Sequence, residues 1–160
     1  MPPSPSDPTA SRATRRTIAL RCSGTQAAIR HNTALLRAAS ELDGLREAAC
    51  AGDAVAQAEF GRRHLTGDGV GKNKRDGLRW CRMAAEQGNA VGQFLLGGCY
   101  YNGEGVLPDP LRAYLWFSLA ADQGVKEAAT IRKLMMPRLS GVQLMEAKRM
   151  LREWRPRRTA

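Results

Sequence analysis

Residues 52–87 read GDAVAQAEFGRRHLTGDGVGKNKRDGLRWCRMAAEQ, and residues 88–123 read GNAVGQFLLGGCYYNGEGVLPDPLRAYLWFSLAADQ. The two stretches match at a fixed step, because the glycines at 52, 88 and 124 give 88 − 52 = 36 and 124 − 88 = 36. The most telling pairs at this step are Gly61 and Gly97, Gly67 and Gly103, Gly69 and Gly105, and Trp80 and Trp116. A period of this size is typical of a repeat array, in which each unit buries its apolar face against its neighbours.

The first half of each unit predicts a helix. In the second unit, Val91, Phe94 and Tyr101 recur at helical spacing within residues 89–101. Gly97 lies inside this segment, where glycine costs about 1 kcal/mol relative to alanine. We expect that cost to be offset by the close approach of a second helix.

The second half of each unit predicts a turn and another helix. Residues 102–105 read NGEG, and glycine accepts the positive φ that a helix exit requires. Asp109 and Pro110 then start the next helix, since proline suits its first turn, and that helix ends at Gly124. Each unit is therefore expected to be a helix, a glycine loop and a second helix.

These residues resemble a known family of repeats, the Sel-one-like (SLR) repeat, a relative of the tetratricopeptide repeat. The second unit carries the pattern at Gln93, Leu96-Gly97, Tyr100, Gly103-Glu104-Gly105-Val106, Asp109, Ala113, Trp116 and Ala120-Ala121. The first unit carries it at Ala56-Gln57, Gly61, Gly67-Asp68-Gly69-Val70, Trp80 and Ala84-Ala85, and departs from it at Phe60, His64, Asn73 and Gly77. The resemblance covers residues 52–123 and implies an all-α, right-handed α-α superhelix of helical hairpins.

The resemblance also implies a function and a binding face. Such families act mostly as adaptors, so we expect a non-catalytic scaffold that binds a partner protein or peptide, with no cofactor and no metal. In tetratricopeptide arrays the first helix of each unit lines the concave face. By analogy the residues nominated for partner binding are Arg62, Leu65, Thr66, Phe94, Tyr101 and Asn102.

Before the first clear unit, residues 25–51 predict degenerate N-terminal capping helices. Residues 48–53 align with residues 84–89, because both segments begin with Ala-Ala and reach glycine at their fifth position. Residues 41–51 are thus expected to be the second helix of a leading unit in which Gly44 replaces the tryptophan. Terminal repeats are generally atypical because one face has no neighbour.

After residue 123 the pattern decays, and residues 124–155 predict a partial repeat followed by a C-terminal capping helix. Pro137 ends or kinks the first helix, and Ser140 with Gln143 forms the capping-box signature of the second. Spacings of three and four predict that most of the apolar residues of this last helix share one stripe: Leu144, Met145, Ala147, Met150, Leu151 and Trp154. Residues 156–160 form a basic tail.

Residues 1–24 predict a disordered basic tail, because residues 1–10 are mostly Pro, Ser and Asp. Arginines without acids follow from Arg12 onward, which is also how organelle transit peptides look. A solvated tail, a start codon assigned too far upstream and a transit segment all stay open. Residues 17–20 are too short for a secretory h-region, and no apolar run reaches the roughly 20 residues that span a bilayer. The expected compartment is the cytoplasm, with an organelle-targeted N-terminus as the alternative.

Two motifs resemble functional sites, a phosphate-binding loop and a cysteine-based metal site, but neither has the residues that such a site requires. Residues 67–72 read GDGVGK, but a phosphate-binding loop needs an earlier glycine where Thr66 stands and Ser or Thr where Asn73 stands. The four cysteines, Cys22, Cys50, Cys81 and Cys99, make no C-x-x-C pair. With only His31 and His64 beside them, zinc-ligand spacing is missing. We expect Cys81 and Cys99 to be small apolar core residues and His64 a packed ring.

The formal charge of +10 and the pI of about 10.2 support an alternative function. Basic residues gather at the N-terminus and then at Arg132, Lys133, Arg138, Lys148, Arg149, Arg152, Arg155, Arg157 and Arg158. Such ends favour a basic accessory factor that binds nucleic acid or an anionic surface, although no nucleic-acid reading motif accompanies them. Self-association is a further alternative, because two clear units make a short stack.

Overall fold

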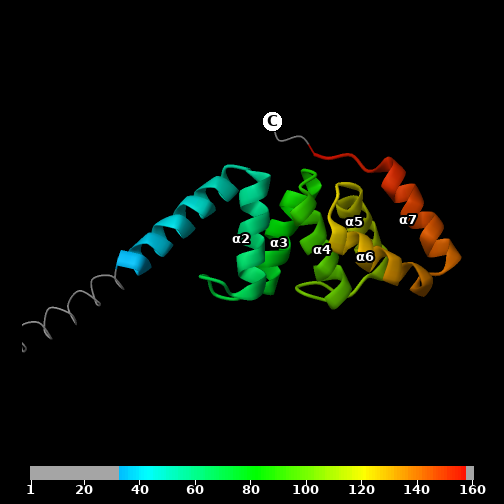
Figure 1. Cartoon of the computed structure of the whole chain (residues 1–160), viewed down its shortest axis with the longest axis horizontal. Helices are drawn as coiled ribbons and strands as arrows, with labels where there is room; N and C mark the ends of the chain where they lie inside the picture. Colours follow the sequence, from blue (N-terminus) through cyan, green and yellow to red (C-terminus); the bar gives the residue numbers. More distant parts are fainter. Residues whose placement is uncertain (1–32, 158–160) are drawn as a thin grey trace, which may run out of the picture. The chain divides into compact units, whose positions relative to one another are not determined.

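The computed structural model describes residues 33–157, so the predicted tail over 1–24 and the start of the N-terminal capping segment lie outside the described residues. The described residues divide into two units, one of residues 33–41 and one of residues 42–157. Helical residues run from 33 to 50, and Figure 1 shows the helices of the second unit that follow them. Within the described part of the chain, no helix is long and apolar enough to cross a bilayer.

Four helices of equal length form the two predicted units. They are α2 (Ala54–Thr66), α3 (Lys74–Glu86), α4 (Ala90–Asn102) and α5 (Pro110–Asp122), each of 13 residues. The helices of the second repeat begin one period after those of the first repeat, since 90 − 54 = 36 and 110 − 74 = 36. The described residues contain helices and no strand. The predicted all-α solenoid of helical hairpins is therefore confirmed (Figure 1).

Short polar side chains fix where these helices begin. The Asp53 carboxylate accepts from the Ala56 amide at 2.8 Å, and Asn89 caps α4 in the same way through the Gly92 amide at 2.8 Å. Asp109 caps α5 with Pro110 in its first turn, as predicted. Side-chain caps satisfy amide groups that have no partner within the helix, which makes the starting residue specific.

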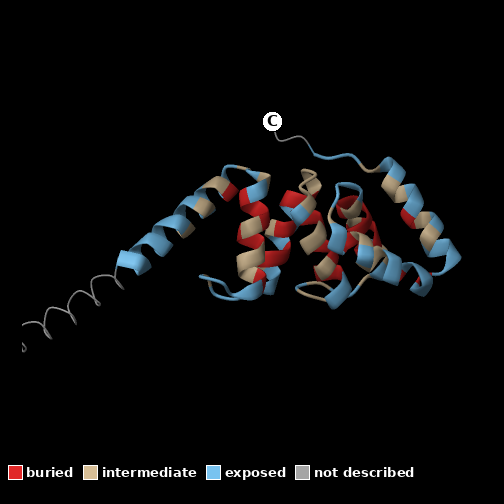
Figure 2. Ribbon diagram, viewed as in Figure 1, coloured by how far each residue is buried: buried red, intermediate tan, exposed pale blue. Residues whose placement is uncertain are grey.

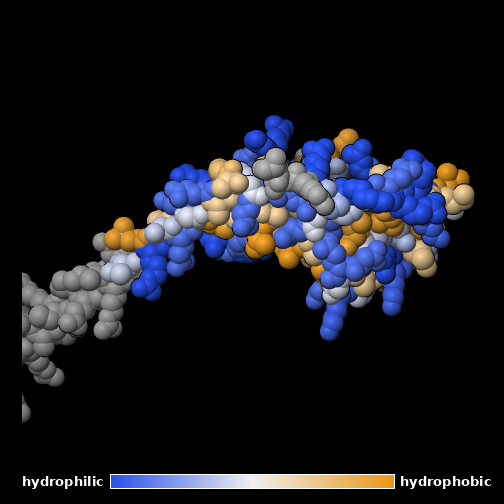
Figure 3. Space-filling view, turned by 90° about the horizontal axis from the view of Figure 1, so that it is seen from above, coloured by the Kyte–Doolittle hydropathy of each residue, from blue (hydrophilic) through white to orange (hydrophobic). Residues whose placement is uncertain are grey.

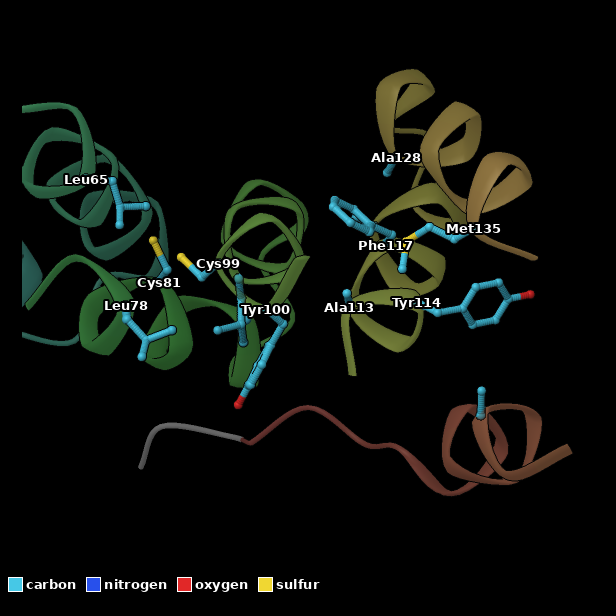
Figure 4. Close-up of a cluster of buried hydrophobic side chains, with 14 of the residues drawn as sticks. Leu65, Leu78, Cys81, Cys99, Tyr100, Ala113, Tyr114, Phe117, Ala128 and Met135 are labelled. Carbon is cyan, nitrogen blue, oxygen red and sulfur yellow. The ribbon is translucent and has the colours of Figure 1, made fainter. Parts of the chain in front are cut away.

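The core runs between the paired helices (Figure 2). Its largest fully buried apolar residues are Phe117 and Leu96, packed in one cluster with Cys81 and Cys99 (Figure 4). A smaller cluster joins Ala49 to Ala56 and Phe60 of α2. The end of the leading helix, residues 42–50, therefore packs against the first repeat, with Leu42 and Leu45 also in contact with that cluster.

Paired helices approach closely at the repeated glycine inside the first helix of each unit. A Cβ atom on Gly61 would lie 2.6 Å from Cys81 Sγ and 2.9 Å from the Cys81 amide nitrogen. A Cβ atom on Gly97 would lie 3.0 Å from Phe117 Cδ1. The contact at Gly97 confirms the predicted close approach of a second helix, and Gly61 shows the same close packing one period earlier.

Buried glutamines join successive units. Gln57 is 1% exposed; its Nε2 donates to the carbonyl of Ala49 at 3.1 Å, and its Oε1 accepts from Gln87 Nε2 at 2.7 Å. One period later Gln93, which is fully buried, repeats this arrangement with Ala85 at 3.4 Å and Gln123 at 2.7 Å. Each buried amide therefore bonds both to the last helix of the preceding unit and to the second helix of its own.

The C-terminal end departs from the repeat. Helix α6 (Lys126–Met135) leads into a 3₁₀ turn, η1 (Met136–Arg138), which contains Pro137, and α7 (Gly141–Glu153) follows. Both hydrogen bonds of the predicted capping box are present, because Ser140 Oγ accepts from the Gln143 amide and Gln143 Oε1 accepts from the Ser140 amide.

Most of the apolar residues of α7 share one stripe, as predicted, and Met145 lies outside it. Ala147 is fully buried and Leu144 packs against the core cluster, whereas Met145 is 73% exposed. The single-residue step from Leu144 turns the helix by about 100° and carries Met145 out of the stripe. Figure 3 shows separate hydrophobic patches among hydrophilic side chains on one face of the molecule.

The chain after α7 runs back along the stack to the first repeat (Figure 1). The Trp154 ring packs edge-on against Trp116 with ring centroids 6.5 Å apart. Arg157 donates its backbone amide to the Glu86 carbonyl at 2.7 Å, and its guanidinium pairs with the Glu86 carboxylate at 3.0 Å. The described part of the predicted basic tail is thus bound to the end of α3.

Gly61→Ala should lower the free energy of unfolding by about 1 to 3 kcal/mol, because the new methyl group would meet the backbone of α3. The matched control is Gly98→Ala in α4, where a Cβ atom would meet no atom within 4 Å. That variant should raise stability by up to about 1 kcal/mol through helix propensity. Urea denaturation of both variants checks the pair, and equal effects would contradict close packing at Gly61.

Gln93→Leu should lower the free energy of unfolding by about 1 to 3 kcal/mol, because the Ala85 carbonyl and the Gln123 side chain each lose a partner. A double-mutant cycle with Gln123→Leu isolates the side-chain pair. We expect a coupling energy of about 0.5 to 1.5 kcal/mol by thermal or chemical denaturation. Strict additivity of the two substitutions would show that the amide contact contributes nothing.

Candidate functional site

The six residues nominated from the sequence line one groove of about 640 Å³. Arg62, Leu65 and Thr66 come from α2, while Phe94, Tyr101 and Asn102 come from α4. The groove is completed by residues that the sequence analysis did not nominate: Lys72, Leu95, Gly98, Glu104, Phe117 and Ile131. The structure therefore brings the nominated residues together, whereas their role in partner binding stays a prediction.

Aromatic rings form the floor of the groove. Phe94 lies against Phe117 with ring centroids 5.7 Å apart, and Tyr101 meets the same ring edge-on at 6.5 Å. Leu65 is buried beside them, while Tyr101 remains 46% exposed. An apolar floor with one accessible aromatic ring suits the burial of an apolar side chain from a bound chain.

Charges at one rim of the groove are held in ion pairs. The Arg62 guanidinium lies 2.7 Å from the Glu59 carboxylate and 3.2 Å from that of Asp68. Hydrogen bonding by Arg62 is the main reason that the pKa of Glu59 falls to about 2. These contacts hold Arg62 in place. The exposed Lys72, which also lines the groove, has no ion pair among the described residues and adds a positive charge to the lining.

Gly98 leaves the middle of the groove open. A Cβ atom added there would meet no atom within 4 Å, although the residue lies inside α4. One period earlier the same position holds Arg62, since 98 − 36 = 62. Superposing the two repeats could therefore have identified Gly98 as a groove residue, because it occupies the position of the nominated Arg62. Phe117 and Ile131 lie on other helices, and the repeat pattern alone does not show that they reach this groove.

Three of the residues that suggested metal or thiol chemistry, His64, Cys81 and Cys99, are packed in the fold, whereas Cys50 is exposed and Cys22 and His31 lie outside the described residues. The His64 ring lies edge-on to Phe60 with centroids 4.7 Å apart, and its Nδ1 is buried without a hydrogen-bond partner. Cys81 and Cys99 are buried free thiols; burial raises the pKa of Cys81 well above its ordinary value and that of Cys99 to about 11. Both thiols are therefore protonated at neutral pH. The described residues contain no group of three or more His, Cys, Asp or Glu side chains able to hold a metal ion.

Comparison with protein families identifies the repeats. Residues 54–89 and 90–125 each match the sequence model of the Sel1 repeat. The chain contains two Sel1 repeats. Proteins with Sel1 repeats generally mediate protein–protein interactions.

Solved structures of Sel1-repeat proteins share this fold. One is a protective antigen present in uropathogenic Escherichia coli strains that displays an SLR fold, with 33% identity over 71% of this chain and a TM-score of 0.67. Another is a Sel1 repeat protein from Oxalobacter formigenes, with 30% identity over 58% of this chain and a TM-score of 0.55. The chain spans 24% and 38% of these two proteins, respectively. No curated protein sequence matches it significantly.

Outside the Sel1 repeats, several of the C-terminal arginines are engaged within the protein. Arg132 pairs with Asp122 at 2.8 Å. Arg149 pairs with Glu146 at 2.6 Å and with Glu153 at 3.0 Å. These pairs reduce the positive field that the sequence alone indicates at this end. The arginines before residue 33 lie outside the described residues.

Replacing His64 by phenylalanine should raise the free energy of unfolding by about 1 kcal/mol. The substitution keeps a ring against Phe60 and removes the buried Nδ1 atom that lacks a partner. His64→Ala serves as the control, because it removes both the ring contact and the polar atom and should destabilise. Chemical denaturation measures both variants; a less stable His64→Phe protein would mean that Nδ1 has a partner in solution.

Proposed function

We propose that this chain is a non-catalytic adaptor whose two Sel1 repeats bind a segment of a partner protein in the groove between α2, α4, α5 and α6. The observation that carries the proposal is the convergence of the six residues nominated from the repeat pattern on a single groove. The general role of Sel1 repeats in protein–protein interaction supports the same assignment.

The shape and charge of the groove define the partner segment. A volume of about 640 Å³ accommodates a few side chains of a peptide. The aromatic floor of Phe94, Tyr101 and Phe117 favours an apolar or aromatic anchor placed over Gly98. The ammonium group of Lys72 favours an acidic residue beside that anchor. Buried aromatic anchors of this kind generally carry most of the binding energy of an interface.

Gly98→Leu tests the groove with little risk to the fold. The Cβ atom of the leucine would meet no atom within 4 Å, its side chain would enter the groove that Gly98 lines, and leucine improves helix propensity. We expect retention of the partner from a lysate of the source cells to fall at least tenfold, which corresponds to about 1.4 kcal/mol. Tagged wild-type and variant proteins are compared by affinity capture and quantitative mass spectrometry.

Gly44→Leu is the matched control, because Gly44 is helical, has no atom within 4 Å of an added Cβ, and does not line the groove. This variant should retain the partner as the wild type does. Circular dichroism should be unchanged in both. If Gly98→Leu captures the same partner as strongly as the wild type, the groove is not the binding site.

The net charge of +10 supports a second candidate, a basic accessory factor that binds nucleic acid or an anionic surface through its arginine-rich ends. The same capture run with nuclease separates the two candidates. Retention that survives nuclease and depends on Gly98 supports the adaptor. Retention that collapses with nuclease and is indifferent to Gly98 supports the basic factor.

A further inference from the structure

A second opening, of about 360 Å³, shares no residue with the groove. It lies between α3, α4, α5 and α7, and its polar wall contains Arg82, Tyr100 and Arg112. Its apolar wall contains Leu115, Trp116 and Met150. The opening therefore combines two cationic side chains with an apolar surface.

Two guanidinium groups converge on one phenol oxygen. Arg82 Nη2 lies 3.2 Å and Arg112 Nη1 lies 3.4 Å from Tyr100 Oη. Arg112 also places its Cζ atom 5.6 Å from the centroid of the Tyr100 ring. The ring itself is fixed in the core, since Tyr100 is only 4% exposed, and Figure 4 shows its hydroxyl directed out of the cluster.

This arrangement leaves an excess of hydrogen-bond donors. A phenol oxygen offers two lone pairs and one proton. The two arginines donate to this oxygen, and among the described residues no hydrogen bond is donated by the Tyr100 hydroxyl. Its proton is therefore available to an acceptor on a bound ligand. Glu86, the one carboxylate that lines the opening, already pairs with Arg157 at 3.0 Å. Arg112 Nε lies 3.3 Å from Asp109 Oδ2, whereas Arg82 has no ion pair in the described part of the chain.

The first repeat lacks this set of donors. Subtracting one period from 82, 100 and 112 gives Arg46, His64 and Asp76. An acid thus stands where the second repeat has Arg112, and an imidazole stands where it has a phenol. The donor set combines Arg82 of the first repeat with Tyr100 and Arg112 of the second, and it is not present one period earlier in the chain.

We propose that this opening binds an oxyanion, a carboxylate or a phosphate group, between Arg82, Arg112 and the Tyr100 hydroxyl. Guanidinium groups favour both anions through charge-assisted hydrogen bonds. The adjoining Leu115, Trp116 and Met150 would contact an apolar group on the same ligand. The site is independent of the partner-binding groove, because the two share no lining residue.

Nuclear magnetic resonance of the arginine Nε–Hε groups tests the site at low ionic strength, where surface charges are least screened. The probes are acetate, inorganic phosphate, phenylacetate and phenyl phosphate. We expect saturable shifts at Arg82 and Arg112 with dissociation constants of about 1 to 10 mM, and tighter binding for the two phenyl compounds. A preference for the phosphates or for the carboxylates identifies which oxyanion the site selects.

Three variants and one control assign the effect. Arg82→Gln and Arg112→Gln should each weaken binding about tenfold, since each removes a charge-assisted hydrogen bond. Tyr100→Phe should weaken it about threefold or more while keeping the buried ring, because it removes only the hydroxyl. Arg79→Gln should leave binding unchanged, because Arg79 is exposed on the same helix and does not line the opening.

The proposal is overturned by either of two results. The first is the lack of any saturable shift with all four probes up to about 50 mM, a concentration well above the expected dissociation constants. The second is an equal loss of binding in Arg79→Gln and Arg82→Gln, which would mean that net charge rather than the converging donors attracts the anion. Circular dichroism of each variant confirms that the helices are intact in the compared proteins.

Discussion

The stack depends on two buried amide groups. Gln57 and Gln93 are almost completely removed from water, and each bonds to a carbonyl of the preceding unit and to a glutamine of its own second helix. A buried amide without partners costs several tenths to a few kcal/mol. Neighbouring units therefore pack in the one arrangement that satisfies both groups. That arrangement sets α2 beside α4 and so creates the groove to which both helices contribute.

Helix α5 gives the second repeat two openings of different chemistry. Phe117 is part of the aromatic floor of the groove, while Leu115 and Trp116 belong to the opening with the two arginines. Successive residues of a helix point about 100° apart, so one short segment serves both surfaces. The groove offers apolar contact, and the other opening offers hydrogen-bond donors, so the two surfaces suit different ligands.

The sequence predicted the helices well because the 36-residue step, the caps at Asp109 and Ser140 and the break at Pro137 are local signals. The sequence also predicted six residues that line the groove, because superposing the two repeats places them on the same face of the first helix of each repeat. Phe117 and Ile131 were missed because their approach depends on how separate helices pack. The Tyr100 site was missed for the same reason: its arginines lie 18 and 12 residues away along the chain. The helical period predicted that most, not all, apolar residues of α7 share a stripe, and Met145 lies off it because one residue turns the helix by about 100°.

The segment after α7 has a mechanical consequence. The curvature of a helical solenoid depends on the small rotation between neighbouring repeats, so a change in that rotation bends or extends the solenoid. Here Trp154 is held at α5 and Arg157 is held at the end of α3, so the segment ties the last helix across the joint between the repeats. Such a tie limits extension of the coil on its own side. The joint between the two repeats is thereby stiffened against bending.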